Sequence, residues 1–501
     1  MKKPFVPLAF AAALLAVVLS VTCCKNNYAG NSVNIPIIDK ALKDTSSIFY
    51  VEFEQYPEEM KKLPIGVFDS GTGGLTVLEK ILSLDRFDNI TGEGKSDEIL
   101  DFAGEHFIYL ADQANMPYGN YDAEGKADYL RELAVKDAIF LLDDNYFQDA
   151  YEEKPSCVKP RVKIIIVACN TATAYGLKSI ESLLEQSGSK VKVIGVINAG
   201  SKATLDMLDI HSGDTPLAIG VLATPGTIAS GAYERTLREE LASRGITEGV
   251  DIVSQSGYGF AEAVDSEPDF VNPLALAVRS TYRGPKIGEE DNCIKLDLLK
   301  AYNFDFSDNR MLTRRGADGK YAELQLNDAA NYARFNLVSL VERHRASGST
   351  APIKAIIMGC THYPFLLETM RQTIEELRTY KSDGTFPYRN LLSEEIEFVD
   401  PAVYTAVECY STLRADNNLA HRITPQKAEC YISVPSKALD DEYLTEDGHL
   451  TYDFKYGREV GTEDLTTKQV PFSNSNIDSN NLERIKKLLP YTYELIAPAM
   501  Q

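Results

Sequence analysis

The sequence predicts an α/β protein with doubly wound parallel sheets, because apolar strand-like runs alternate with amphipathic helical patterns along most of the chain. Two cysteines, Cys169 and Cys360, each stand where such a run ends and a helix pattern begins. A glycine-rich turn over residues 69–74 follows the first run in the same way. Since ligands of open α/β sheets bind at the carboxyl ends of the strands, these three places predict one binding site.

The expected strands are short apolar runs bounded by turn residues. They lie near residues 64–68, 106–110, 162–168, 191–197, 217–222, 250–254, 353–359 and 396–399, with a further strand-like run at 428–434. Polar stretches at 88–101 and 144–160 interrupt the alternation, and we interpret them as surface insertions. A longer insertion covers 268–349 and contains a helix pattern that opens near residue 327. A last helix is expected near 481–489.

These elements predict two α/β domains. We expect the first over residues 62–198, completed by residues 365–435, and the second over residues 199–364, which includes the insertion at 268–349. Residues 436–501 are expected to form a C-terminal extension.

The first residues carry a signal for the localisation of the protein. Lys2 and Lys3 precede an apolar run over residues 8–19, which is too short to cross a bilayer but typical of a signal-peptide core. The following Leu19–Cys24 stretch resembles a bacterial lipoprotein cleavage site, which predicts lipidation of Cys23, although Thr22 stands where a smaller residue is usual. Residues 1–24 are then a leader and 25–61 a tether. The alternative is a plain cleaved signal with two incidental cysteines.

Composition excludes some classes of partner. The formal net charge of −22 argues against nucleic acid or an anionic membrane surface, because phosphate binding needs clustered Lys and Arg. Eight cysteines in a 501-residue chain without a C-x-x-C pair predict neither a disulfide framework nor a zinc or redox motif. For most of them a buried, inert thiol is expected.

Five motifs, in this order along the chain, resemble those of glutamate racemase: Asp69–Leu75, Pro117–Gly119, Ala168–Ala172, Ser230–Tyr233 and Gly359–Pro364. The resemblance covers roughly residues 62–410. It implies two pseudo-symmetric doubly wound domains with the active site in the cleft between them. It also implies a cofactor-independent reaction, without pyridoxal phosphate or metal, in which Cys169 and Cys360 are the two acid/base thiols.

The resemblance further implies which residues bind the substrate: Asp69, Ser70, Tyr118, Gly119, Asn170, Thr171, Thr361 and His362. Each has a simpler alternative as a turn residue, a helix cap or a buried hydrogen-bonding group. The chain departs from the family pattern at residues 256–265 and at Asn198-Ala199, so the acid that contacts the substrate ammonium is left open between Asp265 and Glu267.

The expected function is therefore racemisation of an amino acid, with L- and D-glutamate the first candidates. The alternatives are a related isomerase or racemase acting on another acidic or polar amino acid, and an exported binding lipoprotein without turnover. The expected partners are a small amino acid and a lipid anchor, and a homodimer is left open. The leader favours export to the cell envelope. Synthesis of D-glutamate for peptidoglycan would instead require a cytoplasmic enzyme.

Overall fold

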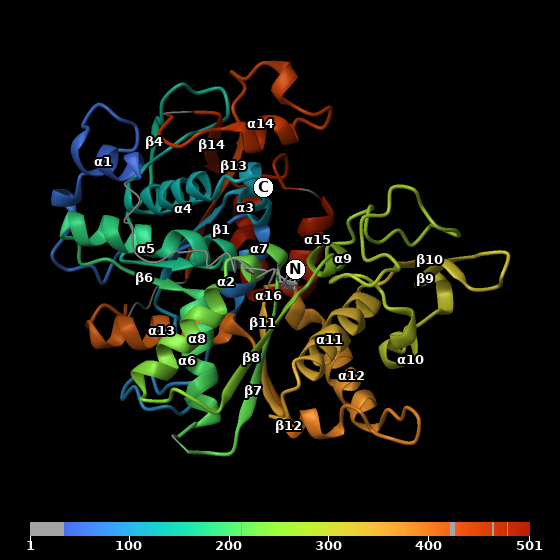
Figure 1. Ribbon diagram of the computed structural model, residues 1–501. Helices are drawn as coiled ribbons and strands as arrows, with labels where there is room; N and C mark the ends of the chain where they lie inside the picture. The colour runs from blue at the N-terminus through green and yellow to red at the C-terminus, as the bar shows by residue number, and fades with distance from the viewer. Residues whose placement is uncertain (1–34, 212, 421–425, 463–464, 478, 501) are drawn as a thin grey trace, which may run out of the picture. The chain divides into compact units, whose positions relative to one another are not determined.

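The computed structural model describes residues 35–211, 213–420, 426–462, 465–477 and 479–500 (Figure 1). The predicted leader, with its lipidation residue Cys23, lies outside these residues. Within them, no helix is long and apolar enough to cross a membrane. The described cysteines are all free thiols.

Two sheets form the framework. The first has the strand order β14-β13-β2-β1-β5-β6 and is parallel except for the antiparallel edge pair β13 and β14. Its strands are β1 (Ile65–Asp69), β2 (His106–Ala111), β5 (Ile164–Val167), β6 (Lys192–Gly195), β13 (Lys427–Pro435) and β14 (Thr467–Pro471). The second sheet is wholly parallel, in the order β12-β11-β7-β8. It consists of β7 (Leu217–Ala223), β8 (Val250–Ser256), β11 (Ile353–Gly359) and β12 (Leu392–Val399).

Helices cover both faces of the first sheet, because its strands are apolar on both sides. The α2 (Leu75–Leu82), α13 (Pro401–Ala415), α15 (Ser479–Leu488) and α16 (Pro490–Ile496) helices share one core with alternate strand residues such as Val67 and Ile166. The α1 (Pro36–Lys43), α4 (Ala127–Leu142) and α5 (Asn170–Ser187) helices share the other core with Phe68 and Ile165. The short α3 (Gly119–Ala123) and α14 (Tyr452–Gly457) adjoin this second core.

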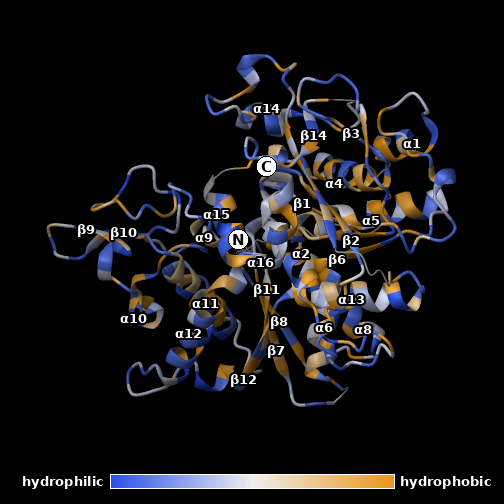
Figure 2. Ribbon diagram, turned by 180° about the vertical axis from the view of Figure 1, so that it is seen from behind, coloured by the Kyte–Doolittle hydropathy of each residue, from blue (hydrophilic) through white to orange (hydrophobic). Residues whose placement is uncertain are grey.

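The second sheet is covered in the same manner. On one face its strands pack with α6 (Val196–Leu208) and α8 (Ala232–Ser243), and on the other with α11 (Ala329–Ala346) and α12 (Leu367–Thr379). Hydrophobic residues colour much of β7 and β11 orange in Figure 2. The remaining elements are α7 (Pro225–Ala229), α9 (Phe260–Val264), α10 (Leu299–Tyr302), the hairpin of β9 (Met311–Arg315) with β10 (Tyr321–Leu326), and the small pair β3 (Asn145–Tyr146) with β4 (Cys157–Val158). The predicted fold class, two α/β units built on parallel sheets, is confirmed.

Three segments differ from the predicted organisation. Residues 35–61 do not form a tether, because Ile37 and Ile38 of α1 are buried in the core that α4 and α5 share. β12 falls within the 365–435 range assigned to the first domain, yet it pairs with β11 of the second sheet. The predicted insertion at 268–349 includes α11, whose buried residues form much of the core beneath the second sheet. Local sequence patterns place such elements along the chain but do not identify the sheet or core that receives them.

Candidate active site

The two cysteines stand at strand ends, as predicted. Cys169 follows β5 and is the N-cap of α5, where its Sγ accepts a hydrogen bond from the backbone N–H of Ala172 at 3.3 Å. Its thiol also lies 3.6 Å from the Oγ of Ser70, to which it donates. Cys360 follows β11 directly, and its Sγ lies 3.5 Å from Nδ1 of His362. Both side chains are 7% exposed, so both thiols are largely shielded from bulk water.

The glycine-rich turn after β1 is held by Asp69. Its Oδ2 accepts hydrogen bonds from the backbone N–H groups of Gly74 at 2.8 Å and Gly71 at 3.3 Å. Glycine is required at position 74, since a Cβ there would lie only 2.4 Å from the Cβ of Asp69. The carboxylate therefore fixes the backbone of the turn.

This turn, which follows β1 of the first sheet, contacts the turn that follows β11 of the second sheet and contains Cys360. A Cβ at Gly73 would lie 3.2 Å from Oγ1 of Thr361 and 3.1 Å from Cε1 of His362. The absence of a side chain at Gly73 thus lets the two turns approach closely. Asp69, Ser70, Thr361 and His362, four of the predicted substrate-binding residues, belong to these two turns.

The start of α5 is docked on the second sheet's helices. The hydroxyl of Tyr233 on α8 donates to Oδ1 of Asn170 at 2.7 Å. Oγ1 of Thr171 lies 3.3 Å from Oγ1 of Thr227 on α7. Asn170 and Thr171 therefore lie where the two sheets' helices meet. Tyr233 lies within one of the five motifs, but its hydrogen bond to Asn170 is a tertiary contact that no local pattern predicts.

The two residues of the other predicted pair, Tyr118 and Gly119, have different surroundings. The Tyr118 hydroxyl donates to the carboxylates of Asp112 at 2.5 Å and Asp137 at 2.8 Å inside the core that α4 and α5 share, so buried partners occupy it. Gly119 lies at the surface of that core against α7, where a Cβ on Gly226 would be 2.7 Å from the Cα of Gly119. The backbone at Gly119, rather than the Tyr118 hydroxyl, faces the second sheet's helices.

A series of contacts between polar side chains begins at His362, next to Cys360. Nε2 of His362 lies 3.1 Å from Oδ1 of Asp265, which follows α9. Asp265 in turn forms an ion pair with Arg484 of α15, in the C-terminal extension. Both candidates for the substrate ammonium have other neighbours. Asp265 contacts His362 and Arg484, and burial raises the pKa of Glu267, against the charge of His362. Sequence patterns carried no signal for Arg484, because its contact joins distant parts of the chain.

The two thiols have chemically different surroundings. Burial, and then the charge of Asp69, raise the pKa of Cys169 to about 12. Burial also raises the pKa of Asp69 itself, against the hydrogen bond from Gly74 and the charge of His362. Burial opposes the charged form of His362, but the hydrogen bond and charge of Cys360, with the charges of Asp69 and Glu262, raise its pKa overall. Burial and the charge of Asp69 therefore both favour the neutral thiol of Cys169.

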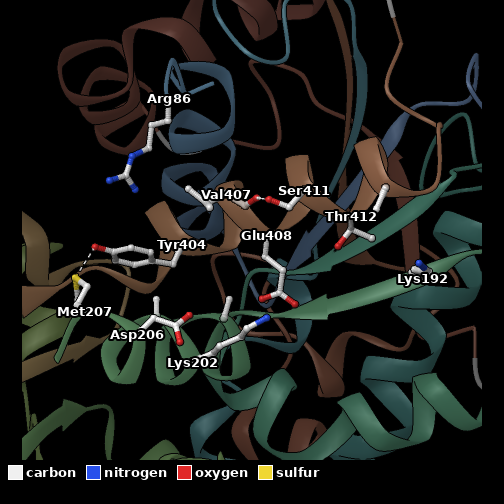
Figure 3. Close-up of a pocket in the computed structure, with 13 residues that line it drawn as sticks. Arg86, Lys192, Lys202, Asp206, Met207, Tyr404, Val407, Glu408, Ser411 and Thr412 are labelled. Atoms are coloured by element: carbon white, nitrogen blue, oxygen red, sulfur yellow. Dashed lines mark hydrogen bonds between the residues drawn. The ribbon is translucent and has the colours of Figure 1, made fainter. Parts of the chain in front are cut away.

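A separate cavity of about 630 Å³ lies between α6 and α13, away from these residues (Figure 3). Lys202 and Asp206 of α6 and Tyr404 and Glu408 of α13 line it. It contains no residue of the predicted site.

No protein-family model matches the chain. Its curated relatives are amino-acid racemases. The relatives are glutamate racemases in particular. The chain is 28% identical to the enzyme of Lactobacillus helveticus over 415 residues, which cover 83% of this chain and 100% of the relative. It is 34% identical to the enzyme of Syntrophus aciditrophicus over 174 residues, 35% of this chain and 47% of the relative. The chain thus spans about half the length of several relatives that it matches.

Solved glutamate racemases also align with the structure. The enzyme of Francisella tularensis is 19% identical, with a TM-score of 0.41, and isoform RacE1 of Bacillus anthracis is 22% identical, with the same TM-score. Each alignment covers 74% of this chain and 88% of the solved chain.

Proposed function

We propose that this protein racemises glutamate without a cofactor, using Cys169 and Cys360 as the two acid/base groups. One observation carries the proposal: the turns that hold these thiols belong to different sheets, and they meet through the glycine-rich turn, Asn170 and Thr171. A substrate between the turns would have one sulfur on each face of its α-carbon. The similarity to curated glutamate racemases supports glutamate as the substrate.

The chemistry follows from what inversion requires. A thiolate on one face removes the α-proton and becomes a thiol, while the thiol on the opposite face donates its proton to the α-carbon. Charge that develops on the substrate carboxylate needs hydrogen-bond donors. The hydroxyls of Ser70, Thr171 and Thr361 and the amide of Asn170 are suited to this, together with the N-terminus of α5.

The neighbours of each cysteine suggest which one is the thiol and which one the base before the reaction. Cys169 is held as the thiol by burial and by the nearby charge of Asp69. The imidazole of His362, 3.5 Å from the sulfur of Cys360, is placed to share that proton. We therefore propose that Cys360 is the base of the resting enzyme and Cys169 the acid. The roles reverse for the opposite enantiomer.

Incubation of the purified protein with L-glutamate in deuterated water tests the proposal. We expect D-glutamate to appear with deuterium at its α-carbon, without added pyridoxal phosphate or metal and in the presence of a chelator. Parallel incubations with L-aspartate, L-glutamine and L-alanine test the specificity. Failure of every amino acid to exchange its α-proton would contradict the proposal, and exchange of another amino acid in preference to glutamate would contradict the substrate.

We further propose that the protein is exported and held at the cell envelope by acyl chains on Cys23. The supports are Lys2, Lys3 and the apolar run at 8–19, which are typical of a signal peptide. Because Ile35 is already buried in a core, the predicted tether extends no further than residue 34.

A further inference from the structure

The C-terminal extension is seated on the helix that follows the glycine-rich turn. The carboxylate of Glu79 on α2 accepts hydrogen bonds from the backbone N–H groups at the start of α16, from Thr492 at 2.8 Å and Tyr491 at 3.3 Å. Ile485 of α15 and Ile496 of α16 are buried in the core that α2 shares. A carboxylate at a helix N-terminus also interacts favourably with the helix dipole. The α15–α16 hairpin is therefore an integral part of the first domain's fold.

From this seat the hairpin reaches the second domain. Helix α15 lies beside α9 in both Figure 1 and Figure 2, and its Arg484 forms the ion pair with Asp265 just after α9. The two side chains are 21% and 27% exposed, so the pair is largely withdrawn from water. Charge pairs in such surroundings are screened less than exposed pairs. Arg484 is thus joined, through Asp265 and His362, to the sulfur of Cys360.

We infer that Arg484 is a positioning residue, which lets Asp265 hold the ring of His362 in place without trapping a proton on it. The inference rests on the proposed two-thiol function. Four acidic groups contact His362 or act on its charge: the thiol of Cys360 and the carboxyl groups of Asp69, Glu262 and Asp265. Glu267 lies near enough for the charge of His362 to act on it. Arg484 is a cation that the structure places on Asp265, at the same oxygen, Oδ1, that His362 contacts.

The reason is that Cys360 must act both as base and as acid. Without Arg484, Asp265 would be balanced by His362 alone, and the imidazole would hold its proton more firmly. A permanent imidazolium stabilises the neighbouring thiolate, which makes Cys360 a weaker base when it must remove the α-proton of the substrate. The imidazole contacts the sulfur directly, whereas Arg484 is joined to it only through Asp265 and His362. The gain of charge on the imidazole therefore outweighs the direct loss of the guanidinium charge.

Alkylation of the thiols tests this without reference to turnover. The full-length protein is treated with iodoacetamide over a range of pH, and the modification of Cys169 and Cys360 is measured separately by peptide mass spectrometry. In Arg484→Met we expect the pH midpoint for Cys360 to fall by about one unit, since removal of a nearby charge shifts a pKa by this order. Cys169 should keep its midpoint, and Lys487→Met, an exposed cation on the same helix, should behave as wild type.

Two further variants test the direction of the shift in the Cys360 midpoint. Asp265→Asn removes the carboxylate that favours the imidazolium, so the Cys360 midpoint should rise, opposite to Arg484→Met. Arg484→Lys keeps the positive charge and should restore most of the wild-type midpoint. If Arg484→Met does not fold, Asp265→Asn and Arg484→Lys decide the matter. Unchanged Cys360 midpoints in the folded variants, or equal shifts at both cysteines, would overturn the inference.

Racemisation is the second measurement. We expect Arg484→Met to lower kcat about tenfold in the direction in which Cys360 removes the proton, because a more stable thiolate is a weaker base by about one pKa unit. A wild-type protein that racemises nothing, with the alkylation midpoints still moving as described, would refute the proposed function but not the link between Arg484 and Cys360. A racemase whose Cys360 midpoint ignores Arg484 would refute the link alone.

Discussion

Nδ1 of His362 lies 3.5 Å from Sγ of Cys360, two residues earlier in the same turn. Among the described residues, the hydrogen-bond partners of Cys169 are instead the hydroxyl of Ser70 and the backbone N–H of Ala172. The two thiols therefore have different hydrogen-bonding neighbours. Mutations on the two sides of the site should have different consequences.

Replacement of either thiol by serine should abolish racemisation. A serine hydroxyl is far too weak an acid to supply the required base at neutral pH. Each single variant, Cys169→Ser and Cys360→Ser, should still exchange the α-proton of one enantiomer through the remaining thiol. Chiral chromatography and proton NMR in deuterated water measure the two activities. Cys157→Ser, a change at a half-exposed cysteine in β4, is the matched control and should leave both unchanged. Full turnover in either active-site variant would contradict the mechanism.

Gly73→Ala should impair catalysis more than folding. The new methyl group would press on Thr361 and His362 at 3.1 to 3.2 Å and separate the two turns by a few tenths of an ångström. Misplacement of reacting groups is costly, so we expect kcat/KM to fall about 10- to 100-fold. Gly94→Ala, where a Cβ meets no atom within 4 Å, is the control. Equal activity of the two variants would argue against a contact that matters for the reaction.

The contribution of His362 to stability should depend on pH. Its pKa in the folded protein is raised above its ordinary value of 6.5, so the charged form is favoured by folding. The stabilisation is complete below the unfolded pKa and is lost as the pH rises through the folded pKa. In urea denaturation at about pH 5.5, 7 and 8.5, the difference in unfolding free energy between wild type and His362→Gln should shrink with increasing pH. A difference in unfolding free energy that grows with pH would contradict a raised pKa of His362 in the folded protein.

Lys163→Met should destabilise the first domain strongly. The Lys163 ammonium is fully buried and bonds Glu105 at 2.6 and 2.9 Å, together with the carbonyl of Asn418 at 2.9 Å. Removal of one partner leaves a buried carboxylate uncompensated, which costs about 3–5 kcal/mol. Lys192→Met, which breaks an exposed pair with Asp416, should cost about 0–1 kcal/mol. Urea titration of both variants at neutral pH provides the comparison.

Mass spectrometry of the mature protein from its native cell tests the proposed address. We expect a chain that begins at Cys23 and carries acyl groups in the membrane fraction, because two acyl chains are needed for stable anchoring. Cys23→Ala is the matched variant and should not be acylated. An intact Met1 terminus in the cytosolic fraction would refute export. It would also return the enzyme to a compartment in which D-glutamate is used for peptidoglycan precursors.

Much of the framework could be predicted because buried parallel strands leave a direct record in the sequence. Runs such as Ile164–Val167 and Ile353–Gly359 are apolar on both faces, and both appear as strands with a cysteine just beyond them. The strand β12, half exposed with the pattern LSEEIEFV, has a weaker signal and was assigned to the wrong sheet. β12 pairs with β11, and no local sequence pattern encodes that pairing.

The site could be predicted as far as its motifs extend. Cys169, Cys360, Asp69 and His362 fall at turns whose residue types already indicate the chemistry. Arg484 could not be found, because nothing within its own helix distinguishes it from the neighbouring lysines. Its role follows only from a tertiary contact with Asp265.

The place of β13 in the first sheet has a consequence for biosynthesis. β13 covers the edge of β2, pairing Lys427 with His106 and Ile432 with Ala111, yet it is translated after all four strands of the second sheet. A nascent chain that has emerged only as far as α13 can complete the second sheet, while β2 still presents unpaired backbone groups. Such an open edge is prone to pairing with other chains. The first domain can therefore close only when synthesis is nearly finished, which leaves the chain accessible to holding chaperones until then.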